Sequence, residues 1–596
     1  MRDVNAGATV GNIIRSNGVV GAAILGNNVK TGDIINVGTI NFNGAGISNS
    51  IQNALAVNFQ AAGQVTLTKA SSAGTFTIAQ GGTVVNDGNG VTGNVVAGDG
   101  QFNSNIDGGD SVNDGTITGG VSQNATITGT GQINGSVGGN AAVNAGQLTG
   151  DVTGNTTVTT GQMTGNTGGT LFLGAGHVFG NVGSSVTFTA ERGALDTTTV
   201  GGPINFNSYN STVTVADTGS LTSVTSSTTT AGNVGFAAEA NVTGAINNIS
   251  TIVIQGATGK TVTFGDDISV ASLSFTNGGT ADLKGSLAGS LNFGTNGGIL
   301  QFSGTNSDGY SFNSAVTNGQ NGTLNVYTNL TSTDASIGEI KTINIGQLGK
   351  PNAINILVNQ PALSLLAASG SISFNDPDST LNILPGQAQT IKFNGNLDGT
   401  TGTGDGILDF DATNGALKLQ GATGNETVGE TNRLKAINLV GANTITLLGG
   451  ANQLSFTKGA AALTIGAGTT FVDQSVTSAS ISAITIGAAG DTGAGTYILD
   501  AVNNNFILTD GLTFGNQDSV LQLQTSIGNN GNSLITLGGD INPGAANTGI
   551  IKISSVNAGA TLTINGVYNV GIAAGNTVQS IDFSGAGSIV MTDPDT

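Results

Sequence analysis

The feature that most constrains the fold of this chain is a short internal repeat between about residues 88 and 185. A triplet of glycine, a polar residue and an apolar residue recurs there with spacings of 15, 16, 15, 15 and 15 residues. The triplets begin at Gly100, Gly115, Gly131, Gly146, Gly161 and Gly176. A unit this short cannot bury its own apolar side chains, so it must stack on its neighbours.

Two adjacent copies of the repeat match at six positions in one register. Gly135, Val137, Asn140, Val143, Gly146 and Gly150 correspond to Gly150, Val152, Asn155, Val158, Gly161 and Gly165. The apolar residues stand singly between Gly, Asn and Thr, without helical spacing. Each repeat is therefore expected to form one coil of a β-solenoid, or a large part of one. Val and Ile would lie inside and Gly and Asn at the corners, where positive φ is needed.

A second pattern, an aliphatic residue, one other residue and then Phe, recurs outside this block. Alternation with period two is typical of a strand whose aliphatic and Phe side chains point the same way. Most of the 22 Phe are therefore expected to be internal, as large apolar side chains prefer. The copies are Ile40–Phe42, Leu273–Phe275, Leu300–Phe302, Ile372–Phe374, Ile391–Phe393, Leu408–Phe410, Leu454–Phe456, Leu512–Phe514 and Ile581–Phe583.

Two segments depart from these patterns. The Ser/Thr run Thr222–Thr230 is a candidate loop or boundary, and Ile51–Phe59 has apolar residues at i, i+4 and i+8, which favours a short helix. We divide the chain into N-terminal solenoid coils (1–87), the short-period solenoid (88–185), a Ser/Thr-rich loop or boundary region (186–235) and a long β-helix with the Phe pattern (236–596). Coils of roughly 20 residues are expected if the solenoid runs throughout.

Composition excludes several classes of function. The chain has no Cys and one His, which excludes a disulfide framework, a thiolate zinc site and a multi-histidine metal centre. Fifteen basic residues oppose thirty-five acidic ones, and no Lys or Arg lies between Lys69 and Arg192, so a nucleic-acid surface is not expected. The longest apolar run near the start, Val19–Gly26, is too short to span a bilayer. We expect no cofactor.

Few residues suggest chemistry. His177 occupies the repeat position that holds Gln101, Thr116, Gln132, Gln147 and Gln162 in other copies, so it is expected to be an exposed coil residue without a partner for general-base chemistry. Acidic clusters occur at Asp107/Asp110, at Asp376/Asp378, and at Asp398, Asp405, Asp409 and Asp411. The last could bind Ca²⁺, with solvated turn aspartates as the alternative. A carboxylate pair of a polysaccharide hydrolase is a further alternative, but Trp is absent and Arg sparse. We therefore assign no catalytic, cofactor-binding or metal-binding residue.

Several short motifs resemble those of autotransporter passenger domains. They are GTINFNG at 38–44, KTINIG at 341–346, IKFNGNL at 391–397 and GILDFD at 406–411. The chain is most similar to the large rickettsial outer-membrane surface antigens, the outer-membrane protein A and B group, especially over 236–596. This resemblance implies an exported passenger folded as an elongated, all-β, right-handed parallel β-helix with few or no α-helices. It also implies a signal peptide and a C-terminal translocating β-barrel, which are not seen in this sequence, so a passenger or part of one is expected.

The resemblance implies a non-enzymatic adhesin and virulence factor on the extracellular face of a Gram-negative outer membrane. Its partner would be a host cell-surface protein, with attachment through a protruding segment for which Thr197–Thr230 is the candidate. The alternative is a structural coat, like an S-layer, or a stalk that acts through lateral self-association, which −20 net charges would make dependent on cations. A polysaccharide-acting β-helix enzyme is the third hypothesis. No nucleic acid and no transmembrane segment in this chain are expected.

Overall fold

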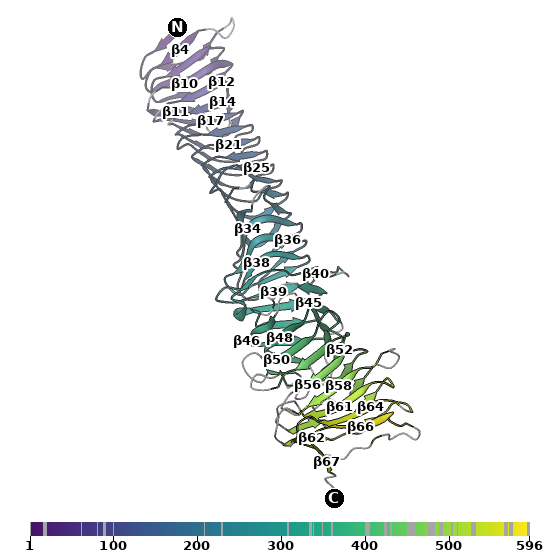
Figure 1. The fold of residues 1–596 in the computed structure, drawn as a ribbon. Helices are drawn as coiled ribbons and strands as arrows, with labels where there is room; N and C mark the ends of the chain where they lie inside the picture. Colours follow the sequence, from purple (N-terminus) through teal and green to yellow (C-terminus); the bar gives the residue numbers. More distant parts are fainter. Residues whose placement is uncertain are drawn as a thin grey trace. The chain divides into compact units, whose positions relative to one another are not determined.

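The chain forms two compact units of stacked β-coils (Figure 1). The computed structural model describes residues 2–15, 21–60, 62–79, 81–86, 91–98, 100–207, 209–227, 230–306, 309–332, 337, 339–347, 350–358, 362–399, 406–421, 426–428, 432–449, 454–455, 460–474, 483–487, 493–501, 505–508, 511–525, 532–546, 548–558, 560–565, 570 and 576–592. Unit 1 comprises Met1–Gly256 and Lys260–Ala271, and unit 2 comprises Ala257–Gly259 and Ser272–Thr596.

The short-period block of unit 1 has three faces, each built from one in-register parallel ladder. Face A contains β14 (Val91–Ala97), β17 (Asp110–Val112), β19 (Ala125–Ile127), β21 (Ala141–Val143), β23 (Thr156–Val158), β25 (Leu171–Leu173) and β27 (Val186–Phe188). Face B contains β15 (Gln101–Asn103), β18 (Thr116–Thr118), β20 (Gln132–Asn134), β22 (Gln147–Thr149), β24 (Gln162–Thr164), β26 (His177–Phe179) and β28 (Ala194–Val200). Face C is a row of single bridges through Ile106, Val121, Val137, Val152, Thr167, Val182 and Val200.

The repeat predicted from the sequence is therefore one coil of the solenoid. Val143 pairs with Val158, 15 residues later, and Val137 bridges to Val152. All four side chains are buried. Face A buries two residues per strand, whereas faces B and C bury one each, because only three residues or fewer of each side have room to alternate.

Asparagine and glycine stabilise the corners of these coils for different reasons. The Asn140 side-chain oxygen accepts a hydrogen bond from the Asn155 backbone N–H at 2.8 Å, and Asn155 in turn accepts from Thr170 N–H at 2.8 Å. Gly150 has φ +146°, and a Cβ there would lie 2.3 Å from the carbonyl oxygen of Gly135 in the preceding coil. The repeat therefore requires Asn as an acceptor and Gly for close backbone approach.

The coils before the block are longer, and they correct one prediction. The segment expected to be helical forms β9 (Ile51–Gln52) and β10 (Ala54–Phe59), and β10 pairs with β7 (Thr39–Phe42) and β12 (Ser71–Ile78). The helix prediction was wrong because Asn53 has φ 56° and interrupts the chain, after which Val57 and Phe59 alternate inward. Leu55, which the helical spacing would bury, is 63% exposed.

The segment proposed as a protrusion, Thr197–Thr230, is also part of the solenoid wall. It contains the end of β28, then β29 (Ile204–Asn205), β30 (Thr212–Leu221) and β31 (Val224–Thr225), which continue the parallel ladders. A register shift between Thr197 and Thr199 is the local irregularity. The described part of this segment forms no separate projecting loop, and residues 208, 228 and 229 lie outside the description. The division into four regions stays a prediction.

Unit 2 has longer coils built on two main ladders. One contains β39 (Gly298–Phe302), β42 (Gly322–Val326), β44 (Thr342–Ile345), β46 (Ala362–Phe374), β48 (Gln389–Gly399), β50 (Leu417–Gly421), β53 (Thr444–Leu447), β56 (Thr470–Asp473), β58 (Thr496–Asp500), β61 (Val520–Thr525), β64 (Ile550–Ser555) and β66 (Ser580–Gly585). The other contains β40 (Tyr310–Ser311), β43 (Leu330–Ser332), β45 (Ala353–Val358), β47 (Thr380–Pro385), β49 (Ile407–Asp411), β52 (Leu434–Val440), β55 (Ala460–Ile465), β57 (Ile484–Ile486), β60 (Leu512–Phe514) and β63 (Ile541–Asn542).

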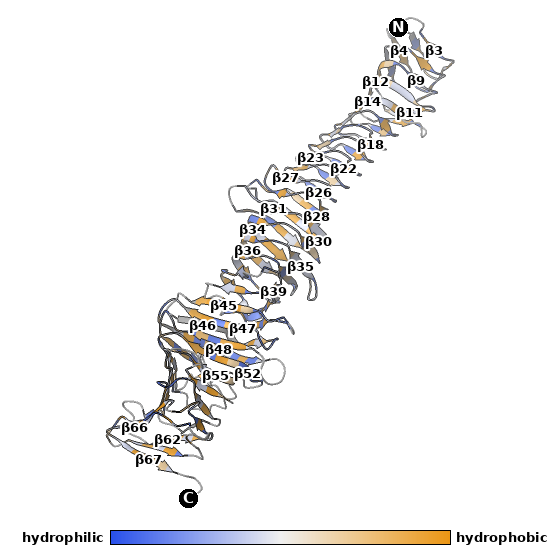
Figure 2. Cartoon of the chain, turned by 90° about the vertical axis from the view of Figure 1, so that its right-hand side faces the viewer, coloured by the Kyte–Doolittle hydropathy of each residue, from blue (hydrophilic) through white to orange (hydrophobic). Residues whose placement is uncertain are grey.

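The coil length in unit 2 is not constant. Ile356 pairs with Ile383, 27 residues later, and Ile553 pairs with Phe583, 30 residues later. The expected coil of about 20 residues is therefore too short for this part of the chain. Hydrophobic residues recur along the strands of both units (Figure 2), which is consistent with a continuous apolar interior within each stack.

Inward-facing Phe confirms the second sequence pattern, with one exception. Phe42, Phe275, Phe302, Phe374, Phe393, Phe410 and Phe514 are all buried. Phe583 is 59% exposed although it continues the row of Ile553, because β66 is the last strand of its ladder. Phe456 lies outside the described residues.

The prediction of an all-β parallel solenoid is confirmed, and the handedness of the coil stays a prediction. Over the described residues the helical structure consists of a single 3₁₀ turn, η1 (Gly319–Asn321). Accordingly, no helix within those residues has the length and apolar character to cross a membrane.

Candidate functional site

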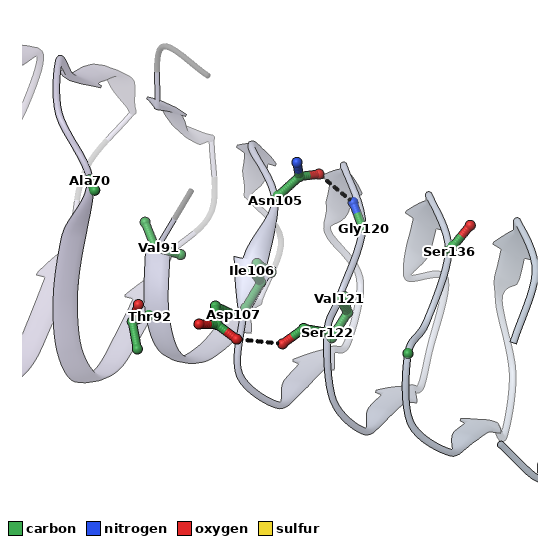
Figure 3. Close-up of a pocket in the computed structure, with 11 residues that line it drawn as sticks. Ala70, Val91, Thr92, Asn105, Ile106, Asp107, Gly120, Val121, Ser122 and Ser136 are labelled. Atoms are coloured by element: carbon green, nitrogen blue, oxygen red, sulfur yellow. Dashed lines mark hydrogen bonds between the residues drawn. The ribbon is translucent and has the colours of Figure 1, made fainter. Parts of the chain in front are cut away.

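Unit 1 carries a groove of about 510 Å³ on face C, where the longer coils give way to the short ones. Figure 3 shows Asn105 and Asp107 on one coil beside Gly120 and Ser122 on the next. Asn105 Oδ1 accepts a hydrogen bond from Gly120 N–H, and Asp107 accepts one from Ser122 Oγ, both at 2.8 Å. These polar groups therefore join neighbouring coils. Residues 87–90, which precede the lining residue Val91, lie outside the description.

A second groove, of about 440 Å³, runs beside face B over four consecutive coils that the structure describes throughout. Its side-chain lining is dominated by Gln132, Gln147, Gln162 and His177, with glycines and threonines of the adjacent corner on the other side. These four side chains occupy the same register position in successive strands β20, β22, β24 and β26. We call them the amide row, which includes His177 at its end.

His177 occupies the exposed coil position expected for it, but it has a partner that the sequence analysis missed. Its Nε2 lies 2.9 Å from Oδ2 of Asp196 in the next coil, and its ring centroid lies 3.9 Å from that of Phe179. The His177 side chain is 38% exposed. Asp196 is 19 residues away, whereas the local period is 15, so the repeat gave no signal for this contact. The imidazole is therefore held in place at the end of the amide row.

The predicted acidic clusters do not converge into one site. Asp107 lies in the face C groove, and Asp376 accepts a hydrogen bond from Asp378 N–H at 2.9 Å within a turn. Asp378 also forms an ion pair with Lys435. The side chain of Asp110 lies outside the description.

The third acidic cluster is divided between two ladders. Asp398 lies in β48, whereas Asp409 and Asp411 lie in β49, and Asp405 lies outside the described residues. Asp411 accepts a hydrogen bond from Thr413 N–H at 2.8 Å. Burial raises the pKa of Asp409, and the hydrogen bond from Asn438, at 2.7 Å, acts in the opposite direction. In the described part of the chain no three acidic, His or Cys residues are grouped as metal ligands would be.

Two polar clusters in unit 2 were not anticipated from the sequence. Asp282 accepts hydrogen bonds from Lys284 Nζ at 2.9 Å, from Gln301 Nε2 at 3.0 Å and from Ser303 Oγ. Lys284 Nζ also donates to Ser303 Oγ at 2.5 Å. Because the serine donates to a carboxylate and accepts from an ammonium group, the cluster satisfies a nearly buried charge and leaves no base to activate the hydroxyl.

The other cluster is internal. The Tyr497 hydroxyl lies 3.3 Å from Asp473 Oδ2, and both residues are buried. Burial raises the pKa of Tyr497 well above its usual value, and the Asp473 carboxylate adds to the rise. The pair is enclosed in the interior of unit 2, so it contributes to the core and presents no reactive surface.

Comparison with known proteins gives two relatives, both named outer membrane protein A. The chain is 30% identical over 382 residues to the Rickettsia rickettsii protein and 30% identical over 325 residues to the Rickettsia conorii protein. These alignments cover 58% and 52% of this chain but only 15% of each relative. The chain thus resembles part of the rickettsial surface antigen, as its motifs indicated. No protein-family model and no solved structure matches it.

Proposed function

We propose that this chain forms part of an exported surface protein of a Gram-negative bacterium that attaches to host cells without catalysing a reaction. The observation that carries the proposal is the 382-residue alignment with a protein named for the outer membrane. The location on the extracellular face, the autotransporter route and the role in virulence belong to the same proposal.

The structure supports a binding scaffold better than an enzyme. The polar clusters described above donate and accept hydrogen bonds among themselves, and the His177 imidazole is hydrogen-bonded to Asp196 beside an open row of amides. Catalysis would need a nucleophile, a base and stabilising donors around one reacting atom. The surface instead offers repeated hydrogen-bonding groups, which suit attachment to an extended partner.

The proposed attachment is tested by measuring binding of the purified chain to cultured host cells by flow cytometry. Saturable binding that the unlabelled chain displaces is expected, and heat-unfolded chain serves as the control. Binding that does not saturate, or that the unfolded chain reproduces, would contradict attachment through the folded surface.

Lateral self-association, the coat-protein alternative, is tested by sedimentation velocity over a concentration series with and without Ca²⁺. An attachment protein should keep a constant sedimentation coefficient at concentrations that saturate cells. A coefficient that rises with concentration or calcium, together with no cell binding, would replace attachment by a coat function.

A further inference from the structure

The groove beside face B is a continuous polar channel within one rigid stack of equal coils. Gln132, Gln147 and Gln162 follow each other in exact register, one coil apart, so their side chains repeat at the strand spacing of about 4.8 Å. Gln147 Nε2 and Gln162 Oε1 lie 3.4 Å apart. Each primary amide carries two donors and one acceptor oxygen, so the row retains groups for a ligand.

His177 closes the amide row with a different surface. Its ring packs beside Phe179 and is hydrogen-bonded to Asp196, which limits its rotation. An exposed ring held in this way offers an apolar face next to the Gln162 amide. Hydrogen-bonding amides next to an exposed ring are the combination that a hydroxyl-rich, partly apolar ring ligand requires.

Charge restricts the ligand further. No Lys or Arg occurs between Lys69 and Arg192, and the chain has a net charge of −20. Sulfated or carboxylated polymers would find no cation in this groove and would be repelled by the field of the whole chain. The ligand should therefore be neutral.

The groove also differs from a protein-docking surface. Its lining consists of amides, hydroxyls, His177, glycine and alanine, without the exposed Trp, Tyr, Arg or large aliphatic anchors that dominate protein interfaces. Its donors repeat along the stacking direction of the coils, which favours an extended polymer lying in that direction over a compact partner.

We infer that this groove binds a neutral linear polysaccharide, with successive sugar rings on successive coils and one ring against His177. The inference rests on the proposed function in naming the chemical class of the attachment partner. Equatorially linked hexopyranose chains are extended and repeat at close to the coil spacing, so the hydroxyls of each ring can reach one amide of the row.

The test is calorimetric titration of the full chain with two neutral β-1,4-linked probes, cellohexaose and the hexamer of N-acetylglucosamine. At least one probe should bind, and Gln147→Ala combined with Gln162→Ala should weaken that binding about tenfold or more, since two ligand hydrogen bonds are lost. His177→Ala should weaken it about fivefold through loss of the ring contact.

Matched controls are available on the same surface. Gln101 occupies the same row two coils before Gln132 but does not line the groove, so Gln101→Ala should bind as the wild type does. Phe172 on face A is 38% exposed, close to the 37% of Phe179 beside His177, so Phe172→Ala controls for loss of a surface ring in Phe179→Ala. Circular dichroism should be unchanged in all these variants.

The outcomes separate this inference from the proposed function. Loss of sugar binding in the groove variants, with the controls intact, supports the inference. Absence of binding to both probes, or equal weakening by Gln101→Ala, overturns it. Host-cell binding that persists in the Gln147/Gln162 variant would mean that attachment uses another surface, probably-independent protein contacts included, and would also overturn the assignment. Sugar binding without any cell binding would instead leave the inference standing and overturn attachment.

Discussion

The side-chain oxygen of Asn140 accepts a hydrogen bond from the backbone N–H of Asn155, one coil later, at 2.8 Å. This contact replaces a strand hydrogen bond at a corner where the backbone turns. The same role is played elsewhere by Asp151, whose carboxylate accepts from Asn166 N–H at 2.7 Å. A row of side-chain acceptors therefore holds adjacent coils at the strand spacing.

Replacing Asn140 by Ala should lower the free energy of unfolding by about 1 kcal/mol, because the Asn155 N–H loses its acceptor. Hydrogen exchange at the Asn155 amide should accelerate in the same variant. Asn140→Asp is the matched control, since Asp151 shows that a carboxylate fits this position. Equal exchange rates in the wild type and Asn140→Ala would contradict the corner role of Asn140.

A buried hydroxyl pair in unit 1 offers a second test. Thr156 and Thr167 are both buried, and their hydroxyl oxygens lie 3.0 Å apart. Either single Thr→Val change should cost about 1 kcal/mol, because it leaves the other hydroxyl without this partner. The double change should recover most of that loss, since Val occupies the equivalent position at Val152. Additive losses in chemical denaturation would show that the two hydroxyls do not interact.

The inward Phe row predicts opposite results for two chemically identical changes. Phe302 is fully buried, so Phe302→Asp should cost about 4 kcal/mol or more and lower the melting temperature of unit 2. Phe583 belongs to the same sequence pattern but is 59% exposed, so Phe583→Asp should change thermal stability little. A melting curve of Phe302→Asp that matches the wild type would refute the internal row.

Asp409 interrupts a row of aligned amides formed by Asn355, Asn382 and Asn438. Its pKa is raised chiefly by burial, so folding favours the protonated form, and stability falls as pH rises from about 4 through the raised folded-state pKa. Asp409→Asn should therefore be more stable than the wild type at pH 7 and nearly equal to it at pH 3. Melting temperatures at both pH values measure this, and a variant less stable than the wild type at pH 7 would contradict it.

The sequence was informative where the coil length is constant. Between Gly100 and Gly176 the 15-residue period showed which residues stack, and the structure explains the conserved-in-register Val137, Asn140 and Gly150 as core, corner acceptor and close-approach positions. Period-two alternation likewise predicted that Phe302 points inward.

Contacts between coils of different length could not be read in this way. His177 meets Asp196 at a separation of 19 residues, and Lys284 meets Ser303 at the same separation in a different ladder. Because coil lengths vary along the chain, no fixed spacing identifies such partners. Ile51 and Phe59 mislead for a related reason, since one residue with positive φ, Asn53, shifts a strand pattern into apparent helical spacing.

The most direct test of the account is whether neighbouring members of the amide row lie one coil apart. The chain has no Cys, so paired cysteines can be introduced without background. Gln147→Cys with Gln162→Cys places two Cα atoms at the strand spacing of about 4.8 Å, within disulfide range, whereas Gln132→Cys with Gln162→Cys places them two spacings apart, beyond it. Under mild oxidation, mass spectrometry should detect an intramolecular disulfide in the first variant and none in the second. A disulfide in the second variant, or none in the first, would contradict the stacked register on which the groove depends.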